Sequence, residues 1–201
     1  MISLVVLAAG KSSRMKKNKL LVSVDGETVI ERVVKTAIRS KVDEVVVVIG
    51  YQAEKIRNRI AALKCKIAVN DRYEKGQSES VKVGLSAISG NAEALMIQPA
   101  DVALIDAQSI NRVIDEYRRS KSRIIIASYH NQSGHPILLD RTLFPEVSTI
   151  DEDSLGLKAV ISRHRTEINH LDAGTENVLV DIDTQDDFDK YFRKPTVRPR
   201  G

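Results

Sequence analysis

Short runs of apolar residues alternate along the chain with longer segments whose apolar positions recur at helical spacing. The first run, residues 4–8, is apolar at every position, which is typical of a strand buried on both faces of a parallel sheet. Similar strands are expected at residues 45–49, 67–69 and 94–98. Because helical segments separate these strands, the pattern predicts an α/β fold with a mostly parallel, Rossmann-like sheet.

Several of the helical segments have clear start signals. Thr28 and Glu31 have the spacing of a capping box, and the apolar residues that follow fall on one face of a helix as far as residue 38. Near the end of the chain, Thr184 opens a last helix, and Asp186 and Asp187 are expected to support its N-terminus. Further helices are expected at residues 53–63, 78–88, 106–119 and 154–162.

The pattern changes after residue 119. Residues 124–129 and 136–139 form two strand-like runs that are joined through turn-forming residues at 131–134. We therefore expect a small antiparallel insertion beside the parallel sheet. Two further short strands are expected near residues 167–170 and 178–180.

The length of the chain indicates how many domains it forms, and the distribution of its charges indicates which class of partner it can bind. A chain of 201 residues, 42% of them hydrophobic, is expected to form a single domain over residues 1–192. Residues 193–201 contain four of the 31 basic residues and no acidic residue, so residues 1–192 carry 27 basic and 27 acidic residues. A neutral body lacks the positive surface that binding to nucleic acid requires. We expect the basic, proline-containing tail to be disordered.

The sequence contains no apolar run of about 18 residues, the length that a transmembrane helix needs, and its first residues lack the pattern of a secretion signal. We therefore expect a soluble, cytoplasmic protein with no membrane partner.

The loop after the first strand is the first candidate for a binding site, because ligands of open α/β sheets bind beyond the carboxyl ends of the strands. Small residues at 8–10 allow backbone N–H groups to approach a polyphosphate, and Arg14 and Lys19 can neutralise its charge. The loop has neither the P-loop spacing nor the dinucleotide-binding spacing of glycines.

The order of residues in this loop resembles the N-terminal signature of the nucleotidyltransferases related to the molybdenum-cofactor guanylyl- and cytidylyltransferases. The resemblance implies a three-layer α/β/α fold of the nucleotide-diphospho-sugar transferase type, in which the loop binds a nucleoside triphosphate. Lys16 stands where the family usually has Gly, so we expect the far turn of the loop to differ in shape. The residues that match, and that the resemblance places at the nucleotide, are Leu7, Ala8, Ala9, Gly10, Ser12, Arg14 and Lys19.

The resemblance continues through two further segments. It places Gly76 and Ser80 near the nucleotide base, although Ser80 is equally well interpreted as an ordinary residue early in a helix. After the strand at 94–98 the family has a Gly-Asp-x-Pro-like motif whose Asp binds magnesium. Asp101 matches that Asp, whereas Ala100 and Ala103 replace the usual Gly and Pro.

The last two matching segments imply the acceptor side and the second metal ligand. Gly134, His135 and Pro136 match the Gly-His-Pro of the cytidylyltransferase branch, which lies at the edge of the acceptor pocket. The segment from Asp181 to Asp187 resembles the family's Asp-x-Asp-Thr-Pro-Glu-Asp, and Asp183 is the candidate for the second magnesium ligand.

Together these matches imply a magnesium-dependent nucleotidyltransferase. Asp101 and Asp183 would hold Mg²⁺, a hard cation that prefers carboxylates and phosphates. Arg14, Lys19 and Asp101 would be the catalytic residues, and an ionised acceptor phosphate needs neither a protein nucleophile nor a general base. The favoured reaction is transfer of CMP from CTP to the phosphate of molybdenum-loaded molybdopterin, with release of pyrophosphate.

Two alternatives stay open. One is a nucleotidyltransferase whose acceptor is a sugar phosphate or a polyol phosphate. The other is a non-catalytic relative that binds the nucleotide or the finished cofactor and delivers it to the apoprotein of a molybdoenzyme. The departures from the family pattern at Lys16, Ala100 and Ala103 motivate this second alternative.

Overall fold

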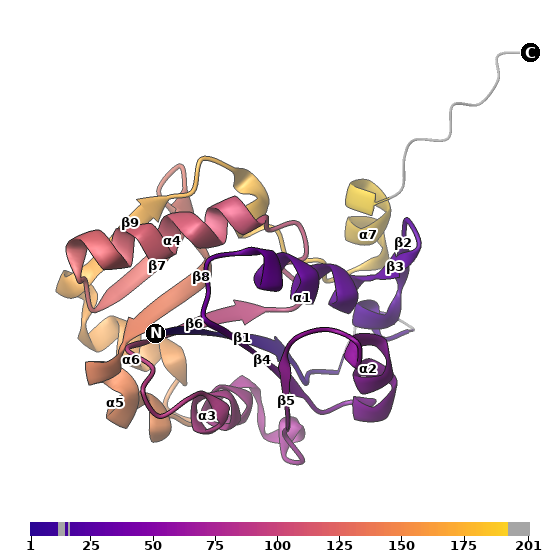
Figure 1. The fold of residues 1–201 in the computed structure, drawn as a ribbon, viewed down its shortest axis with the longest axis horizontal. Coiled ribbons are helices and arrows are strands. Elements are labelled where there is room, and N and C mark those ends of the chain that lie inside the picture. The colour runs from indigo at the N-terminus through magenta and orange to yellow at the C-terminus, as the bar shows by residue number, and fades with distance from the viewer. Residues whose placement is uncertain (12–14, 16, 193–201) are drawn as a thin grey trace, which may run out of the picture.

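The chain is described by a computed structural model that covers residues 1–11, 15 and 17–192. The expectation of a disordered tail at 193–201 falls outside these described residues. A seven-stranded sheet runs through the centre of the molecule, in the order β5-β4-β1-β6-β8-β7-β9 (Figure 1). Its strands are β1 (Ile2–Ala8), β4 (Glu44–Ile49), β5 (Lys66–Val69), β6 (Ala94–Pro99), β7 (Ile124–Tyr129), β8 (Gln132–Asp140) and β9 (Ile168–Asp172).

Helices cover both faces of this sheet, which confirms the predicted three-layer α/β/α fold. One face carries α1 (Val29–Arg39), α2 (Ala53–Ile60), α4 (Ala107–Ser120) and α7 (Gln185–Phe192), whose apolar residues share one core. The other carries α3 (Gln77–Ala87), α5 (Phe144–Ser148) and α6 (Leu157–Arg163), which share a second core. In Figure 1, α1 and α4 lie on one side of the sheet and α3, α5 and α6 on the other.

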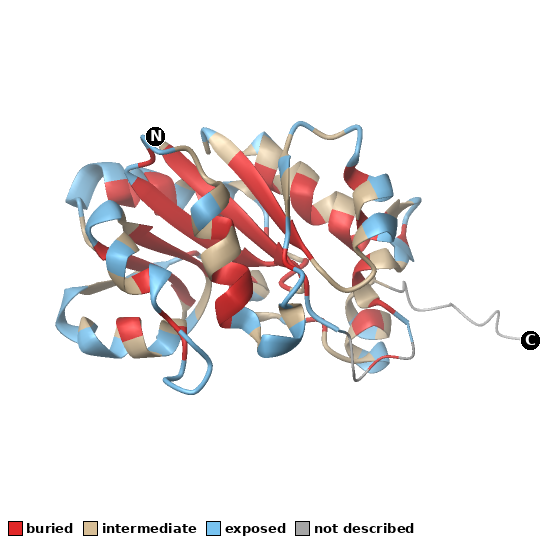
Figure 2. Ribbon diagram, turned by 90° about the horizontal axis from the view of Figure 1, so that it is seen from below, coloured by how far each residue is buried: buried red, intermediate tan, exposed pale blue. Residues whose placement is uncertain are grey.

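Alternation along β1 explains why both cores form. Leu4 and Val6 pack into the core below α1, whereas Val5 and Leu7 pack into the core below α3. Successive side chains of a strand point to opposite faces, so a strand that is apolar at every position can bury both. Figure 2 shows the strands as the most buried part of the molecule, with exposed residues concentrated on the helices and loops.

Short elements connect the layers. The described residues include the 3₁₀ helices η1 (Lys19–Leu21), η2 (Tyr73–Lys75), η3 (Arg141–Leu143), η4 (Arg165–Glu167) and η5 (Glu176–Leu179). The two-stranded sheet of β2 (Ser23–Val24) and β3 (Glu27–Thr28), which the sequence analysis did not predict, leads directly into α1. Among the described residues, no helix has both the length and the apolar character needed to cross a bilayer.

The predicted antiparallel insertion is confirmed, and it forms part of the main sheet. β7 and β8 pair as predicted, but β8 also pairs antiparallel with β6, so the hairpin completes the main sheet. The turn between them is shorter than expected, because His130 and Asn131 both have positive φ and β8 already begins at Gln132. β8 is the one strand of the seven that runs against the others.

The prediction of a strand near residues 178–180 is wrong, because residues 176–179 form the 3₁₀ helix η5. By contrast, the start signals of α1 and α7 are confirmed, whereas the helix expected from residue 154 begins at Leu157. The hydroxyl of Thr28 accepts a hydrogen bond from the backbone N–H of Glu31, and the Glu31 carboxylate accepts one in return, so the capping box is complete. At α7, the carboxylate of Asp187 accepts hydrogen bonds from the backbone N–H and the hydroxyl of Thr184.

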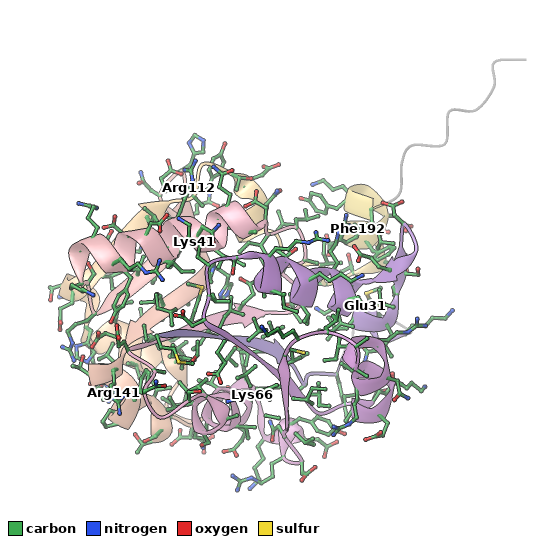
Figure 3. All side chains as sticks on the ribbon, viewed as in Figure 1. Glu31, Lys41, Lys66, Arg112, Arg141 and Phe192 are labelled. Carbon is green, nitrogen blue, oxygen red and sulfur yellow. The ribbon has the colours of Figure 1, made fainter. Side chains whose placement is uncertain are left out.

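The last helix closes one corner of the molecule against α1. Phe188 of α7 is buried in the core that α1 shares, and the guanidinium of Arg32 lies 5.5 Å from the centre of the Phe192 ring. Figure 3 shows Phe192 in this corner, close to the start of α1 at Glu31. The packing places the residues that precede α7 near the centre of the sheet.

The strand order fixes where a ligand can bind. From β1 the chain proceeds outward to β4 and β5, and then returns to place β6 on the other side of β1. The connections therefore diverge between β1 and β6, and a crevice opens beyond the carboxyl ends of these two strands. This position agrees with the two loops that the sequence analysis singled out.

Candidate functional site

A pocket of about 280 Å³ opens at the carboxyl ends of β1 and β6. The structure brings most of the predicted nucleotide and metal residues to it, although they come from distant parts of the chain. Ser12, Arg14 and Lys16 lie outside the described residues, so the predictions for them stay predictions. The predicted residues that line the pocket are Leu7, Ala8, Ala9, Gly10, Lys19, Gly76, Ser80, Asp101 and Asp183.

The end of β1 forms one wall and leaves space in front of its backbone. The carbonyl oxygens of Leu7 and Ala9 accept hydrogen bonds from the backbone N–H groups of Ala100 and Tyr51, at 3.0 and 2.9 Å, which fixes this segment between its neighbours. At Gly10, a Cβ atom would meet no other atom within 4 Å. The small residues therefore leave room for a ligand to approach the backbone.

Lys19, Asp101 and Asp183 form the charged centre of the pocket. The Nζ atom of Lys19 lies 2.9 Å from Oδ2 of Asp101 and 2.8 Å from Oδ1 of Asp183. The Lys19 side chain is 13% exposed and both aspartates are 30% exposed. Burial lowers the pKa of Lys19, but the two carboxylates outweigh burial and raise the pKa above its ordinary value. The lysine therefore stays charged between two anions.

Local structure positions each of these three groups. Asp101 lies two residues after the end of β6, and its carbonyl oxygen accepts a hydrogen bond of 3.0 Å from the N–H of Ile182, which ties the Asp183 segment to the end of β6. The segment from 181 to 183 has no regular secondary structure. Lys19 begins η1, which the Asn18 side chain caps by accepting a hydrogen bond from the N–H of Leu20.

The donor set at this centre fits a magnesium ion. Two carboxylates already converge on a single positive charge, the ammonium group of Lys19, which occupies a position suited to a cation. Within the described ranges, no group of three or more His, Cys, Asp or Glu side chains is arranged so that it could hold a metal ion. Magnesium is usually held by one or two carboxylates together with water and substrate phosphates, so the pair suffices.

Gly76 and Ser80 lie at the start of α3, on the other side of the pocket. Gly76 has a φ of +104°, and a Cβ atom there would lie 2.2 Å from Cγ of Glu152. The hydroxyl of Ser80 accepts a hydrogen bond of 2.9 Å from Nδ2 of Asn70 and is buried. Ser80 is thus an early helix residue, as one interpretation expected, and it also lines the pocket; its contact with a nucleotide base stays a prediction.

A second pocket of about 340 Å³ adjoins the first, and Gln77 lines both. His135 lines this second pocket, and its buried Nδ1 atom has no hydrogen-bond partner among the described residues. Burial lowers the pKa of His135, and nearby Asp101 opposes this effect only in part, so the imidazole is neutral at neutral pH. A neutral imidazole offers one donor and one acceptor to a ligand.

The two neighbours of His135 do not line either pocket but hold it in place. A Cβ atom on Gly134 would lie 2.2 Å from the carbonyl oxygen of Val178, so only glycine allows η5 to pack this closely. Pro136 is buried in β8. Of the three predicted acceptor residues, only His135 therefore lines one of the two pockets.

Sequence reasoning missed several residues of the first pocket. Lys11, Tyr73 and Gln77 also line it, and Lys11 forms an ion pair with Glu74 and lies 5.7 Å from the centre of the Tyr73 ring. Lys11 lies within the matching loop, at a position that the motif leaves variable. Its basic character is the one signal that could have identified it.

The two alanines that depart from the family motif are accommodated by packing. Ala100 and Ala103 are 0% and 3% exposed and belong to the core that α1 shares. Neither replacement displaces Asp101 from Lys19. The charged centre is therefore intact despite the altered motif.

Comparison with known proteins agrees with this geometry. The MobA-like NTP transferase domain family matches residues 4–168. The purine catabolism protein PucB of Bacillus subtilis is 30% identical over an alignment of 202 residues, gaps included. The alignment covers 94% of this chain and 95% of PucB. The bifunctional protein GlmU of Prochlorococcus marinus is 27% identical over 158 residues, and the match spans 77% of this chain but only 35% of GlmU.

Solved structures support the same assignment. The crystal structure of Rv0371c from Mycobacterium tuberculosis superposes with a TM-score of 0.81 and 25% identity, over 96% of this chain and 97% of Rv0371c. Rv0371c has also been crystallised in complex with manganese. The family match covers most of the chain, and the pocket places the family's motif residues together. The chain therefore belongs to the MobA-like NTP transferase family of nucleotidyltransferases.

Proposed function

We infer that this protein transfers CMP from CTP to the phosphate of molybdenum-loaded molybdopterin and releases pyrophosphate, with magnesium as the metal ion. The observation that carries this proposal is the convergence of Lys19, Asp101 and Asp183 in one pocket beside the small-residue end of β1. Two carboxylates and one lysine are the groups that a metal-bound triphosphate needs.

The first step is binding of the triphosphate. The backbone at Ala8 to Gly10 borders open space, so its N–H groups are placed to donate hydrogen bonds to phosphate oxygens. When bound by Asp101 and Asp183, magnesium supplies neutralisation of the phosphate charge. The manganese complex of Rv0371c supports a divalent ion in this fold. Lys19 lies in the same pocket and can exchange its carboxylate contacts for contacts with phosphate.

The second step is transfer. An oxygen of the acceptor phosphate forms a bond to the α-phosphorus of CTP, and the bond from that phosphorus to the bridging oxygen breaks, so that pyrophosphate leaves with the electron pair. The acceptor oxygen is already ionised, so no protein group has to remove a proton. His135, neutral and at the border with the second pocket, is placed to donate a hydrogen bond to the acceptor phosphate. Lys19 offsets the charge that develops on the leaving group.

The choice of CTP and of a pterin acceptor rests on sequence resemblance, through Gly134-His135-Pro136 and the segment from Asp181 to Asp187. The second pocket supports an acceptor with an apolar body, because six of its twelve lining residues have aliphatic side chains. A sugar-phosphate or polyol-phosphate acceptor is the main competing possibility. The pterin acceptor and the sugar or polyol phosphates differ in polarity. The rate of pyrophosphate release with each acceptor can therefore distinguish between them.

A pyrophosphate-release assay across CTP, GTP, UTP and ATP tests the proposal. The enzyme is supplied with magnesium and either metal-loaded molybdopterin or a set of sugar and polyol phosphates. We expect release with CTP and the loaded pterin, and none without magnesium. Equal or faster release with GTP would overturn the choice of base, and release only with a sugar or polyol phosphate would overturn the acceptor. No release with any acceptor, together with retained cofactor binding, would support the non-catalytic alternative.

A further inference from the structure

The second pocket has an inner end and an outer end. Gln77 and His135 mark the inner end. Gln77 also lines the first pocket, and His135 is near enough to Asp101 of that pocket for the carboxylate charge to raise the pKa of its imidazole against the effect of burial. Leu155, at 70% exposure, and the exposed Lys158 mark the outer end. Under the proposed function, the reacting phosphate of the acceptor must lie at the inner end, where it can reach the α-phosphorus.

The wall between these ends is apolar. It consists of side chains from α3, β6, β8 and α6, which cannot form hydrogen bonds with the hydroxyl groups of a sugar. An acceptor that fills the pocket therefore needs an apolar or aromatic body next to its phosphate. The residues of this wall are Val81, Ile97, Ile137, Leu157 and Ile161.

Two charged side chains, those of Glu152 and Lys158, line the pocket, and they differ in their contacts with the described residues. The carboxylate of Glu152 accepts a hydrogen bond of 2.5 Å from the backbone N–H of Ser78, so it is held at the start of α3. Lys158 makes no ion pair or side-chain hydrogen bond within the part of the chain that the structure describes. Its backbone N–H donates a hydrogen bond to the carbonyl oxygen of Leu155. By comparison, Lys82 of α3 pairs with Glu79.

A cation at the outer end has no contact with the reacting phosphate at the inner end. We propose that Lys158 pairs with a second anionic group of the acceptor, at the end of the molecule away from the phosphate that reacts. The acceptor class is thus a phosphate monoester with an apolar body and a remote negative charge. This inference rests on the proposed function, which it extends by naming a residue that selects the acceptor.

The contribution of a second anionic group to acceptor affinity can be measured by equilibrium binding, with pairs of ligands that differ in one anionic group. Metal-loaded and metal-free molybdopterin share the pterin and the phosphate but differ in the anionic metal–oxo group. 4-Carboxyphenyl phosphate and phenyl phosphate share an aromatic body and the phosphate but differ in one carboxylate. We expect the wild-type protein to bind the more anionic member of at least one pair about tenfold more tightly, as a charge-assisted contact allows.

The variants separate a specific contact from a structural effect. Lys158→Gln is expected to abolish the preference, and Lys158→Arg to keep it. Lys64→Gln is the matched control, because Lys64 is an exposed lysine before the edge strand β5 and lines neither pocket. CTP affinity should stay within about twofold of wild type in every variant, since Lys158 does not line the first pocket.

Two results would overturn the inference: no preference in either pair for the wild-type protein, or an undiminished preference in Lys158→Gln. Failure of the proposed function has a different signature. In that case, the wild-type protein releases no pyrophosphate from CTP with metal-loaded molybdopterin, whatever the binding measurements show.

Discussion

The ammonium group of Lys19 lies 2.9 Å from the carboxylate of Asp101, although 82 positions separate the two residues in the chain. Asp183 approaches the same ammonium at 2.8 Å. The lysine thus offsets part of the negative charge of the two carboxylates that are expected to hold a metal ion.

Removal of this lysine should make the carboxylate pair bind magnesium without nucleotide. In Lys19→Met the two aspartates lose a positive charge between them, so a divalent ion relieves their repulsion. We expect 10 mM magnesium chloride, roughly the upper end of ordinary assay conditions, to raise the melting temperature of this variant about 2–4 °C more than that of wild type. Lys41→Met is the control, because Lys41 pairs with Asp115 on the surface between α1 and α4. Equal shifts in all three proteins would contradict the interpretation.

Gly76 should tolerate no side chain. A residue with a Cβ atom is strained at a φ of +104°, and Glu152 would have to move and release the N–H of Ser78. We expect Gly76→Ala to lower the free energy of unfolding by about 1–3 kcal/mol and to weaken CTP binding. In the control Gly90→Ala, the new Cβ meets nothing within 4 Å, so stability should hardly change. Urea unfolding measures the stability of both variants, and titration with CTP measures the binding. Similar losses of stability in the two variants would refute the prediction.

Glu44 should contribute stability that depends on pH. Burial raises the pKa of its carboxyl, but contacts with Lys66, Ser3 and Ser89 outweigh burial and lower the pKa from 4.5 to about 2. Because the folded-state pKa is lowered, the contribution is fully present above pH 4.5 and is lost as the pH falls towards 2.

Urea unfolding of Glu44→Gln tests this. The variant should be less stable than wild type by about 2 kcal/mol at neutral pH, as expected for a hydrogen-bonded buried charge. The difference should shrink at low pH. The control Glu54→Gln removes a carboxylate that is 79% exposed, so it should change stability by less than about 0.5 kcal/mol. A difference between Glu44→Gln and wild type that is constant with pH would show that the charge is not responsible.

His164 should stabilise the protein in the opposite pH range. Its ring nitrogens lie 2.8 Å from Glu167 and 2.7 Å from Glu146, and hydrogen bonds to these two carboxylates raise its pKa. A raised folded-state pKa gives stability that is fully present below the ordinary value of 6.5 and is lost as the pH rises through the raised value. Wild type should therefore lose more stability between pH 6 and pH 9 than His164→Gln. His170→Gln should follow wild type, and parallel profiles for all three would disprove the assignment.

The parallel strands and most helices could be predicted because their apolar spacing is strong. The place of β8 could not, since an apolar run such as residues 136–139 has the same pattern in an insertion and in the main sheet. The three residues at 178–180 are too short to distinguish a strand from a 3₁₀ helix. Pairing between β6 and β8 and the packing of η5 on Gly134 are tertiary contacts, which local sequence does not encode.

The site divides in the same way. Asp101 and Asp183 were identified through family resemblance, and the structure adds that both contact Lys19. Lys158 follows no motif that the sequence analysis recognised. Its importance depends on a pocket that α3, β6, β8 and α6 form together, and only the folded chain shows that pocket.

Magnesium-dependent release of pyrophosphate from CTP by Asp101→Asn, with metal-loaded molybdopterin as acceptor, tests the central claim most directly. The substitution keeps the shape of the side chain but removes a charge from the metal site, so the rate should fall at least about 100-fold. Asp115→Asn, which alters a carboxylate paired with Lys41 on the surface, should retain the wild-type rate. A rate for Asp101→Asn equal to that of wild type would contradict the assignment of Asp101 to the metal site.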